Sequence, residues 1–332
     1  MVSSATPVFV DCDNTMGLPR SEIDDGLTIL YLLAQPSVSI VGVSATYGNG
    51  SVDAVVRQTR RLIHAVGLDV PVCRGREPAR IPAGGQPTAG GARLAPAARE
   101  AAEPPSEAAR ALVAAAREHD GRLVVLGLGA LTNIAEAGAL DPEFYLRLAG
   151  IYAMGGYLVP VRFRLRQVRE LNFSADPVAS FRVLYAPCPV TIASAQLCLA
   201  ARFGARELIG HNRGPRTLRR IVRRWFLDFS RYTGEPGFYL WDLVPAAAIV
   251  SPQRVPRHLV RLRSTTEDLR AGFLHIDELE PAIDAERLDS AMPGIVSLPR
   301  AIVGERRFSS ECAAAWAAAA NEHDFRQVFV RA

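Results

Sequence analysis

The stretch VFVDCDNTMGLPRSEIDDGLTILYLLA, residues 8–34, joins an apolar run, a polar turn and an apolar helical pattern. Asp11 and Asp13 follow the first run, and Asp24 and Asp25 precede the second. Like charges repel, and an unpaired charge at the end of a buried strand is costly. A bound cation would resolve this conflict, so the stretch indicates a metal site between a strand and a helix.

The rest of the chain repeats the order of strand and helix. Apolar, β-rich runs predict strands at 8–11, 38–46, 122–129, 150–156 and 189–194. Helical patterns lie between them at 25–35, 52–66, 106–119, 132–139 and 176–186. This alternation predicts an α/β fold, a single domain over 1–332 with a mostly parallel central sheet flanked by helices. Ligands of such sheets bind beyond the carboxyl ends of the strands.

Other segments have weaker patterns. Residues 77–106 are rich in Pro, Gly and Ala and predict an irregular surface loop. The segment 216–250 is expected to be helical, with breaks near Gly234–Gly237 and at Pro245. Short strands are expected at 258–264 and 272–277, and a final helix around 310–325.

Composition limits the class of protein. The 332 residues are 49% hydrophobic and 22% charged, as expected of a globular protein with a substantial core. No apolar run is long enough to span a membrane and no secretion signal is evident, so we expect a soluble cytoplasmic protein with no membrane partner. The five scattered cysteines fit reduced thiols. All 38 basic residues are arginine, which excludes chemistry that needs a lysine.

The acidic residues allow three interpretations. Asp24 and Asp25 alone would suit the first turn of a helix, where carboxylates favour free N–H groups and the helix dipole. The sequence DCDNT, residues 11–15, also matches the DxDxT of haloacid dehalogenase-type phosphatases, with Mg²⁺ beside the two aspartates. That family normally uses a lysine to hold the phosphoryl group, and this chain has none.

The third interpretation takes all four acids as one unit. DxDxxxDD with an insertion resembles the signature of the inosine–uridine-preferring nucleoside hydrolases. Asp11 to Asp25 spans fifteen residues where the family usually has eight, and the extra residues fall in the turn NTMGLPRSEI. Further segments resemble family motifs in the same order: TYGNG (46–50), LGLGALTNIA (126–135), AMGG (153–156), RELNFSADP (169–177) and WDLVPAAA (241–248).

The resemblance implies a set of site residues. The metal ligands would be Asp13, Asp25, Asp242 and the backbone carbonyl of Leu128, with Asp11 behind them. Because these are oxygen ligands in a carboxylate-rich set, Ca²⁺ is the expected ion. Asp13 would also act as the base that takes a proton from the attacking water. The residues implied in binding the sugar are Asp24, Asn49, Met154, Glu170 and Asn172.

The resemblance also implies an activity, the hydrolysis of the N-glycosidic bond of a ribonucleoside to give base and ribose. The reaction passes through an oxocarbenium-like state that negative groups stabilise. Many family members have a His before the late Asp as leaving-group acid, and Trp241 stands there in this chain. A tryptophan resembles the purine-specific branch, where indole stacking eases protonation of the base, so a purine or other aromatic base is expected.

Several of these residues have a purely structural alternative. Asn49 would serve as a helix cap near Ser51, and Thr132–Asn133 as the cap of the next helix. Glu170 and Asn172 would bind solvent or arginine, and Trp241 would fill the core. Asp176–Pro177 is a helix start by its local chemistry, and we assign it no catalytic role.

One departure from the family concerns the substrate. The segment VRFRLRQVR, residues 161–169, replaces an expected Asn for the 5′-hydroxyl. Arg162, Arg164 and Arg166 alternate, so an extended strand would project them on one side, either to solvent or to an anionic 5′ group of the substrate. The 77–106 loop also lacks the family's HGxDG segment.

Alternative functions follow from these departures. The same scaffold would act on a modified, 5′-anionic or C-linked nucleoside, or bind a nucleoside without catalysis. The arginine-rich segment 216–232 spreads its charges over several helix faces, so we expect no nucleic-acid partner. The expected partner is a small nucleoside, and the expected assembly a homodimer or homotetramer.

Overall fold

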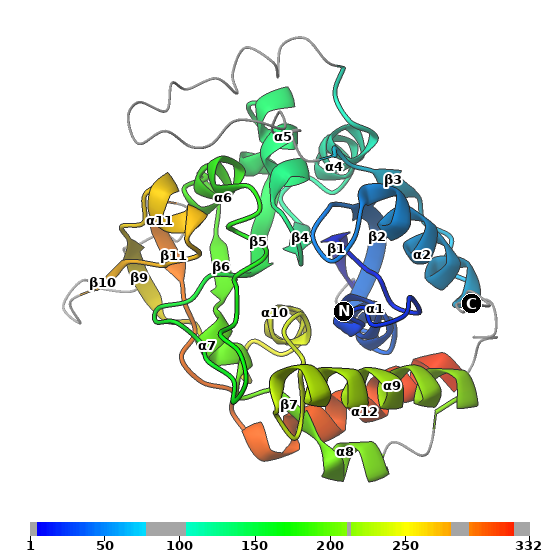
Figure 1. The fold of residues 1–332 in the computed structure, drawn as a ribbon. Helices are drawn as coiled ribbons and strands as arrows, with labels where there is room; N and C mark the ends of the chain where they lie inside the picture. Colours follow the sequence, from blue (N-terminus) through cyan, green and yellow to red (C-terminus); the bar gives the residue numbers. More distant parts are fainter. Residues whose placement is uncertain (1–4, 78–103, 211–213, 280–291, 322–332) are drawn as a thin grey trace, which may run out of the picture.

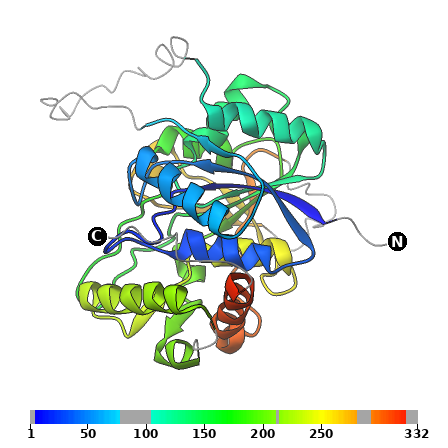
Figure 2. The ribbon, with the colours of Figure 1, turned by 90° about the vertical axis from the view of Figure 1, so that its right-hand side faces the viewer.

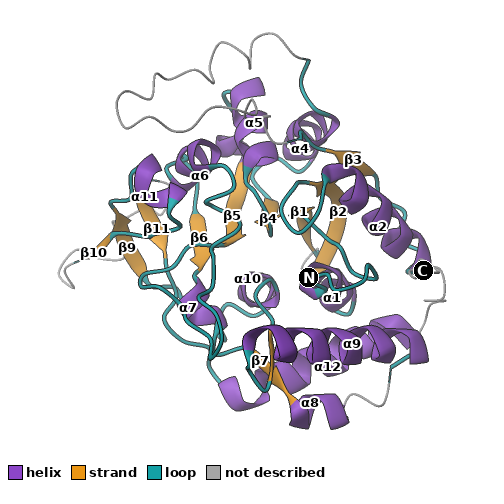
Figure 3. Ribbon diagram, viewed as in Figure 1, coloured by secondary structure: helices purple, strands orange, loops and turns teal. Residues whose placement is uncertain are grey.

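The computed structural model describes residues 5–77, 104–210, 214–279 and 292–321. Within them a nine-stranded sheet has the order β10–β9–β11–β6–β5–β4–β1–β2–β3 (Figures 1 and 3). Its strands are β1 (Thr6–Cys12), β2 (Val38–Ala45), β3 (Val72–Arg74), β4 (Leu123–Gly127), β5 (Leu148–Met154), β6 (Val190–Ala193), β9 (Leu259–Leu262), β10 (Ile276–Glu278) and β11 (Ile295–Ser297). All neighbouring pairs are parallel except β9 with β10 and β11. The predicted mostly parallel sheet is confirmed.

Helices cover both faces of the sheet. They are α1 (Asp24–Leu33), α2 (Val52–Ala65), α4 (Glu107–Glu118), α5 (Thr132–Leu140), α6 (Pro177–Leu184), α7 (Ala195–Cys198), α8 (Ala205–Gly210), α9 (Arg216–Thr233), α10 (Leu243–Val250), α11 (Thr266–Arg270) and α12 (Glu305–Asn321). Figure 2 shows α1 and α10 on one side of the sheet, with α9 and α12 in a further layer outside them. A small antiparallel pair, β7 (Arg202–Gly204) and β8 (Gly237–Tyr239), lies apart from the main sheet.

Alternation along each strand divides the core into two parts. Val8 and Val10 of β1 pack in the cluster that contains α1, α2 and α10, while Phe9 between them packs in the cluster of α4, α5 and α6. Successive strand side chains point to opposite faces, so a strand covered on both sides is apolar throughout. This explains why VFV reads as a continuous apolar run rather than an alternating one.

The strand register aligns the carboxyl ends on which the site is built. Asp11 of β1 pairs with Gly127 of β4, and Gly127 pairs with Ala153 of β5. On the other side Cys12 pairs with Ala45 of β2. The segments that follow, starting with Asp13, Thr46, Leu128 and Gly155, therefore leave the sheet along one edge.

Some sequence expectations need correction. Pro245 does not break a helix: it is the third residue of α10, where its missing N–H has no intrahelical acceptor. The helix expected around 310–325 starts earlier, at Glu305, and its last residues lie outside the described part. Most of the predicted loop at 77–106 lies outside it as well.

The segment 161–169 is also not an extended strand. Val168 N donates to Val161 O at 2.8 Å and Phe163 N donates to Arg166 O at 2.7 Å, which defines a hairpin. Its tip contacts the end of α9, because Leu165 N donates to Thr233 O at 3.0 Å. The expectation that one extended side would present Arg162, Arg164 and Arg166 together is therefore wrong.

The turn inserted between the acids is well anchored. Met16 is fully buried against Gly26 of α1, and its carbonyl accepts from Gln58 Nε2 of α2 at 3.0 Å. Asn14 Oδ1 accepts from Met16 N at 3.0 Å. These contacts fix the turn to two helices, so the extra residues lengthen the connection without separating its ends.

Candidate active site

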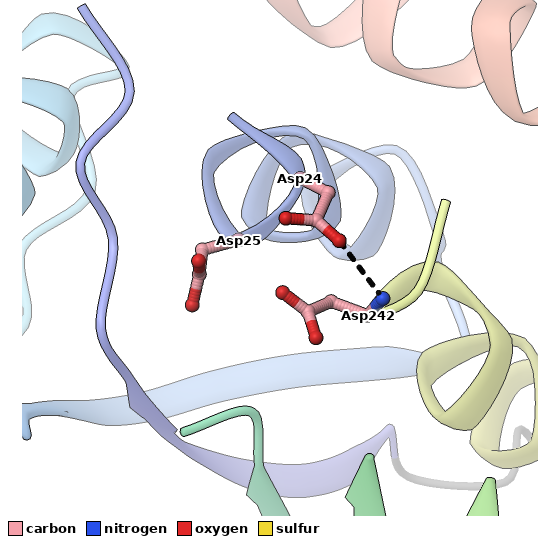
Figure 4. A group of neighbouring side chains, drawn as sticks. All are labelled: Asp24, Asp25 and Asp242. Atoms are coloured by element: carbon pink, nitrogen blue, oxygen red, sulfur yellow. Dashed lines mark hydrogen bonds between the residues drawn. The ribbon is translucent and has the colours of Figure 1, made fainter. Parts of the chain in front are cut away.

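Three carboxylates converge at the N-terminal ends of two helices. Asp24 and Asp25 begin α1, and Asp242 immediately precedes α10. Each has one oxygen within 4.8 Å of an oxygen of the other two, and Figure 4 shows all three side chains pointing into one space. All three are buried. The sequence places Asp242 more than two hundred residues from the other two acids, so only the fold brings them together.

Their hydrogen bonds link segments that are distant in sequence. Asp25 Oδ1 accepts from Asp13 N at 3.1 Å, and Asp24 Oδ2 accepts from Asp242 N at 3.2 Å. The residue that caps α1 is Ile23, which makes no side-chain cap hydrogen bond. The acids thus do more than serve as a helix cap.

The remaining oxygens fit a cation. Asp24 Oδ1 and Asp25 Oδ2 are buried without a hydrogen-bond partner among the residues the structure describes. Buried polar atoms are normally satisfied, and a set of carboxylate oxygens around one space is the donor set of a hard divalent ion. These three residues therefore fit a metal. Asp25 and Asp242 are two of the predicted ligands, whereas Asp24 is predicted to bind the sugar, and the predicted ligands Asp13 and Leu128 are not in this group of three.

The pKa values of the three carboxyls also indicate a bound cation. Burial raises the pKa of Asp24 from 3.8 to about 6, and the Asp242 N–H partly opposes this rise. Burial, and then the charges of the neighbouring carboxylates, raise the pKa values of Asp25 and Asp242 well above the usual range. Without a counter-ion the group cannot hold all its charges at neutral pH.

Asp13 lies beside this group and is held by Asn49. Asn49 donates to Asp13 twice, from its backbone N to Oδ2 at 2.6 Å and from Nδ2 to Oδ1 at 3.1 Å. Burial raises the pKa of Asp13 to about 7, and the Asn49 N–H lowers it. Ser51, not Asn49, caps α2, with Oγ accepting from Ala54 N at 3.4 Å. The cap interpretation of Asn49 is therefore wrong.

Asp11 lies deeper in a polar pocket that sequence reasoning did not identify. Ser44 Oγ donates to Asp11 Oδ1 at 2.5 Å, and Asn133 Nδ2 donates to the same oxygen at 2.8 Å. Burial raises the pKa of Asp11 to about 7, against these two hydrogen bonds. Asn133 is thus not a helix cap, and Thr132 donates to Asp176 Oδ2 at 2.9 Å. Ser44 lies near the end of β2 and Asn133 is the second residue of α5, and neither position alone marks the residue as a partner of Asp11.

Asn172 joins two strand ends. Its Nδ2 donates to Leu128 O and to Met154 O, both at 3.0 Å, and lies 3.3 Å from Met154 Sδ. The carbonyl of Leu128, the predicted backbone ligand, therefore already accepts one hydrogen bond. The structure brings these three predicted residues together.

Glu170 has a different role from its neighbour. Its carboxylate accepts from the backbone N–H groups of Gly156, Asn172, Phe173 and Ser174, at 2.6 to 3.2 Å. Such a set holds the loop after residue 170 in shape. Asp176 accepts from Ala179 N at 3.0 Å and caps α6, as the sequence predicts.

Trp241 is half-buried in an aromatic cluster next to Asp242. Its ring lies 5.2 Å from that of Tyr239 and 6.4 Å from that of Phe163. Phe163 and Tyr239 stack nearly parallel, with an interplanar angle of 4°. Phe163 belongs to the 161–168 hairpin, so the hairpin supports the wall of rings that holds Trp241.

The arginines of the same hairpin are exposed. Arg166 Nε donates to Tyr232 O at 3.1 Å, and its guanidinium lies 3.9 Å from the centre of the Tyr232 ring. Arg164 N donates to Glu235 Oε1 at 3.1 Å. Arg166 therefore has a structural use at the end of α9.

A cavity of about 420 Å³ lies next to Gly48, and none of the site's aspartates lines it. It is lined by Tyr47, Gly48, Gly50, Ser51, Glu77, Leu171, Ser174 and Ala175. Gly48 lies between this cavity and Asp13, and the lining residue Leu171 directly precedes Asn172 in the chain. A side chain at position 48 would not fit, because a Cβ there would lie 1.9 Å from Asp13 Oδ2.

Comparison with known proteins identifies this arrangement. The family model "Inosine-uridine preferring nucleoside hydrolase" matches residues 8–293. The chain belongs to the inosine–uridine-preferring nucleoside hydrolase family. It is therefore an N-ribohydrolase, and the predicted resemblance is confirmed. The family assignment also removes the phosphatase interpretation of residues 11–15.

Relatives of this nucleoside hydrolase carry different substrate names. It is 26% identical over 272 residues to "Uridine nucleosidase 1" of Arabidopsis thaliana, covering 77% of this chain and 79% of the relative. It is 27% identical over 195 residues to "Pyrimidine-specific ribonucleoside hydrolase RihA" of Klebsiella pneumoniae subsp. pneumoniae, covering 57% and 60%. The fold matches "Purine-Preferring Ribonucleoside Hydrolase from Gardnerella vaginalis" with a TM-score of 0.73 at 20% identity, covering 95% and 99%.

No helix in the described ranges combines the length and the apolar character that crossing a bilayer requires.

Proposed function

We propose that this nucleoside hydrolase uses Ca²⁺ to cleave the N-glycosidic bond of a ribonucleoside, releasing base and ribose. The observation that carries the proposal is the buried group Asp24, Asp25 and Asp242, with two orphaned oxygens facing a common space. Oxygen-only donors and room for additional ligands favour calcium over ions that prefer nitrogen or sulfur. When bound, the ion supplies positive charge that neutralises the carboxylates and polarises a water and a sugar diol.

The side chains of the protein account for the remaining chemistry. Asp13 is oriented by two hydrogen bonds from Asn49 and takes the proton of the attacking water. Asp24 accepts hydrogen bonds from the sugar hydroxyls, with Asn172 and Met154 at the neighbouring strand ends. The negative carboxylates face the positive charge that develops on the sugar ring as the bond breaks.

A purine or other aromatic base is the favoured leaving group. Trp241 precedes Asp242 directly and is held in place by Tyr239 and Phe163. An indole that stacks on the base favours its protonated form through the ring quadrupole. A preference for pyrimidine nucleosides is the second candidate, because the printed names of curated relatives include uridine and pyrimidine activities.

A panel of nucleosides tests the activity. Inosine, guanosine, adenosine, uridine, cytidine and C-linked pseudouridine are each assayed for free base and free sugar, with and without a chelator and with Ca²⁺ restored. We expect release from purine nucleosides that the chelator abolishes and Ca²⁺ restores. Asp13→Ala should remove activity while leaving thermal unfolding cooperative. Base release that persists in this variant would overturn the role of Asp13.

The same panel includes nucleoside 5′-monophosphates, which test the anion-binding hypothesis for Arg162, Arg164 and Arg166. Equal or better turnover of the plain nucleoside counts against it. Location in the cytoplasm and assembly into a homodimer or homotetramer stay predictions, and light scattering on the purified protein measures the assembly directly.

A further inference from the structure

The hairpin at residues 161–168 is fastened to the end of α9. Leu165 N, at the tip of the hairpin, donates to Thr233 O at 3.0 Å. The Leu165 side chain packs so closely on Gly234 that a Cβ added to this glycine would lie 2.9 Å from Leu165 Cγ. Gly234 ends α9 with a φ of 78°, a left-handed conformation that glycine adopts without strain. These contacts fix the hairpin at one place on the helix end.

Phe163 is the hairpin side chain that this attachment holds in the core. It is 8% exposed. Its ring lies 5.5 Å from that of Phe229 on α9, nearly edge-on at 70°, and 5.4 Å from that of Tyr239, nearly parallel at 4°. Both are geometries that aromatic pairs prefer. Three rings from three segments that are distant in the sequence therefore pack as one unit.

Trp241 packs against two rings of this unit. Its ring lies 5.2 Å from that of Tyr239 at 44°, and 6.4 Å from that of Phe163 at 47°. Tyr239 precedes Trp241 by two residues, so these two rings move with the same segment. Among the ring contacts between described residues, Phe163 is the one that reaches Trp241 from another part of the chain. Because Trp241 is only half-buried, the loss of this neighbour would open other rotamers to the indole.

We propose that Phe163 is a positioning residue that holds the Trp241 indole in the orientation in which it meets the leaving base. Phe163 acts through Trp241 and Tyr239 and does not itself touch the substrate. The encounter with the base rests on the proposed function, whereas the orientation of Trp241 is a property of the protein without substrate. The two are therefore measured separately.

Fluorine NMR of the full-length protein, labelled with 5-fluorotryptophan, measures the orientation of the indole. The chain has three tryptophans, and the resonance of Trp241 is the one that disappears in Trp241→Phe. We expect this resonance to broaden or split in Phe163→Leu, because the indole then exchanges between rotamers. It should stay a single line in Phe163→Tyr, which keeps the ring. Phe163→Met, with an unbranched side chain, takes the place of Phe163→Leu if the latter does not unfold cooperatively.

Kinetics connect the orientation to the reaction. We expect kcat/KM on the best nucleoside of the panel to fall about tenfold in Phe163→Leu, as the loss of a well-packed aromatic pair implies, and to recover in Phe163→Tyr. In the Trp241→Phe background Phe163→Leu should have a much smaller effect, because the indole that it positions is absent.

Phe181→Leu is the matched control. Phe181 stacks on Tyr185 with ring centres 4.4 Å apart, in the core on the opposite face of the sheet, so the control removes an equal ring far from Trp241. It should leave the Trp241 resonance and kcat/KM unchanged. An unchanged Trp241 line in Phe163→Leu overturns the proposal, and so does an equal loss of kcat/KM with and without Trp241. A wild-type protein that cleaves no nucleoside refutes the proposed function, and the Trp241 resonance then decides the positioning by itself.

Discussion

Asn49→Ala should shift the pH dependence of the reaction rather than abolish it. The substitution leaves the backbone hydrogen bond from residue 49 to Asp13 Oδ2 intact and removes only the donation from Nδ2 to Oδ1, at 3.1 Å. Both bonds favour the ionised carboxylate. Their partial loss therefore raises the pKa of Asp13, and the base is ionised only at higher pH.

The size of the shift follows from the bond that is lost. A hydrogen bond to a charged group contributes about 1.5–3 kcal/mol. At about 1.4 kcal/mol per pKa unit, this corresponds to about one to two units. Starting from a pKa of about 7 for Asp13, the ionised fraction at pH 7 falls from about a half to between about a tenth and about a hundredth. A bound cation lowers both values, so the difference between the variants is the quantity to measure.

The assay is kcat/KM against pH for wild type and Asn49→Ala on the best nucleoside of the panel. We expect the acid limb to move up by about one to two pH units, with the rate largely recovered on the alkaline side. Asn172→Ala provides the contrast, because Asn172 contacts Leu128 O and Met154 O rather than Asp13. Its acid limb should stay in place. A uniform loss of rate in Asn49→Ala with an unmoved limb would refute the reasoning.

Three further predictions use other parts of the site. Gly48→Ala places a Cβ 1.9 Å from Asp13 Oδ2 and should lower kcat about a hundredfold. In the control Gly210→Ala the added Cβ meets nothing described within 4 Å, and this variant should have normal activity in the same assay. Trp241→Phe should lower kcat/KM more for inosine than for uridine, and an equal loss for both argues against stacking on the base. Folding raises the pKa of Asp13 from 3.8 to about 7 and that of Asp24 to about 6. The contribution of these two protonated carboxyls to the free energy of unfolding is therefore complete below pH 3.8 and is lost as pH rises through the two raised values. Calorimetry of chelator-treated protein should therefore show Tm falling between about pH 4 and pH 7, and Ca²⁺ should reverse the fall; a flat or rising Tm contradicts it.

The sequence predicts the sheet well because burial on both faces leaves a strong local signal. β1, β2, β4, β5 and β6 all coincide with apolar, β-rich runs, and the gathering of site residues beyond their carboxyl ends follows from the parallel topology. β3, β7, β8 and β11, with three residues each, are too short for a periodic signal. The sequence does not predict that Pro245 lies in the first turn of α10, because local chemistry alone does not show where a helix begins.

The contacts between distant segments account for what the sequence does not show. Asn133 lies 122 residues from Asp11, and nothing in LTNIA separates an amide that binds a buried carboxylate from one that caps a helix. The hairpin at 161–168 likewise depends on the end of α9, whose carbonyl at Thr233 receives the tip. In both cases a local pattern fits two structures equally well, and a partner far along the chain decides between them.

The inserted turn, residues 14–23, illustrates how a chain of this family can gain residues directly beside its acidic site. The acids on its two sides are each held by contacts outside the insertion, Asp13, just after β1, by Asn49, and Asp25 by its place in α1 and by the N–H of Asp13. Because loop closure costs little for each added residue, the connection between them is free to lengthen once its new residues find their own anchors, as Met16 does on Gly26. A site built this way can acquire new residues in the turn without moving the acids on its two sides. Exchanging residues 14–23 for a short turn tests this separation: Asp24, Asp25 and Asp242 should still bind the ion, and complete loss of binding in a folded variant would show that the turn holds the acids in place.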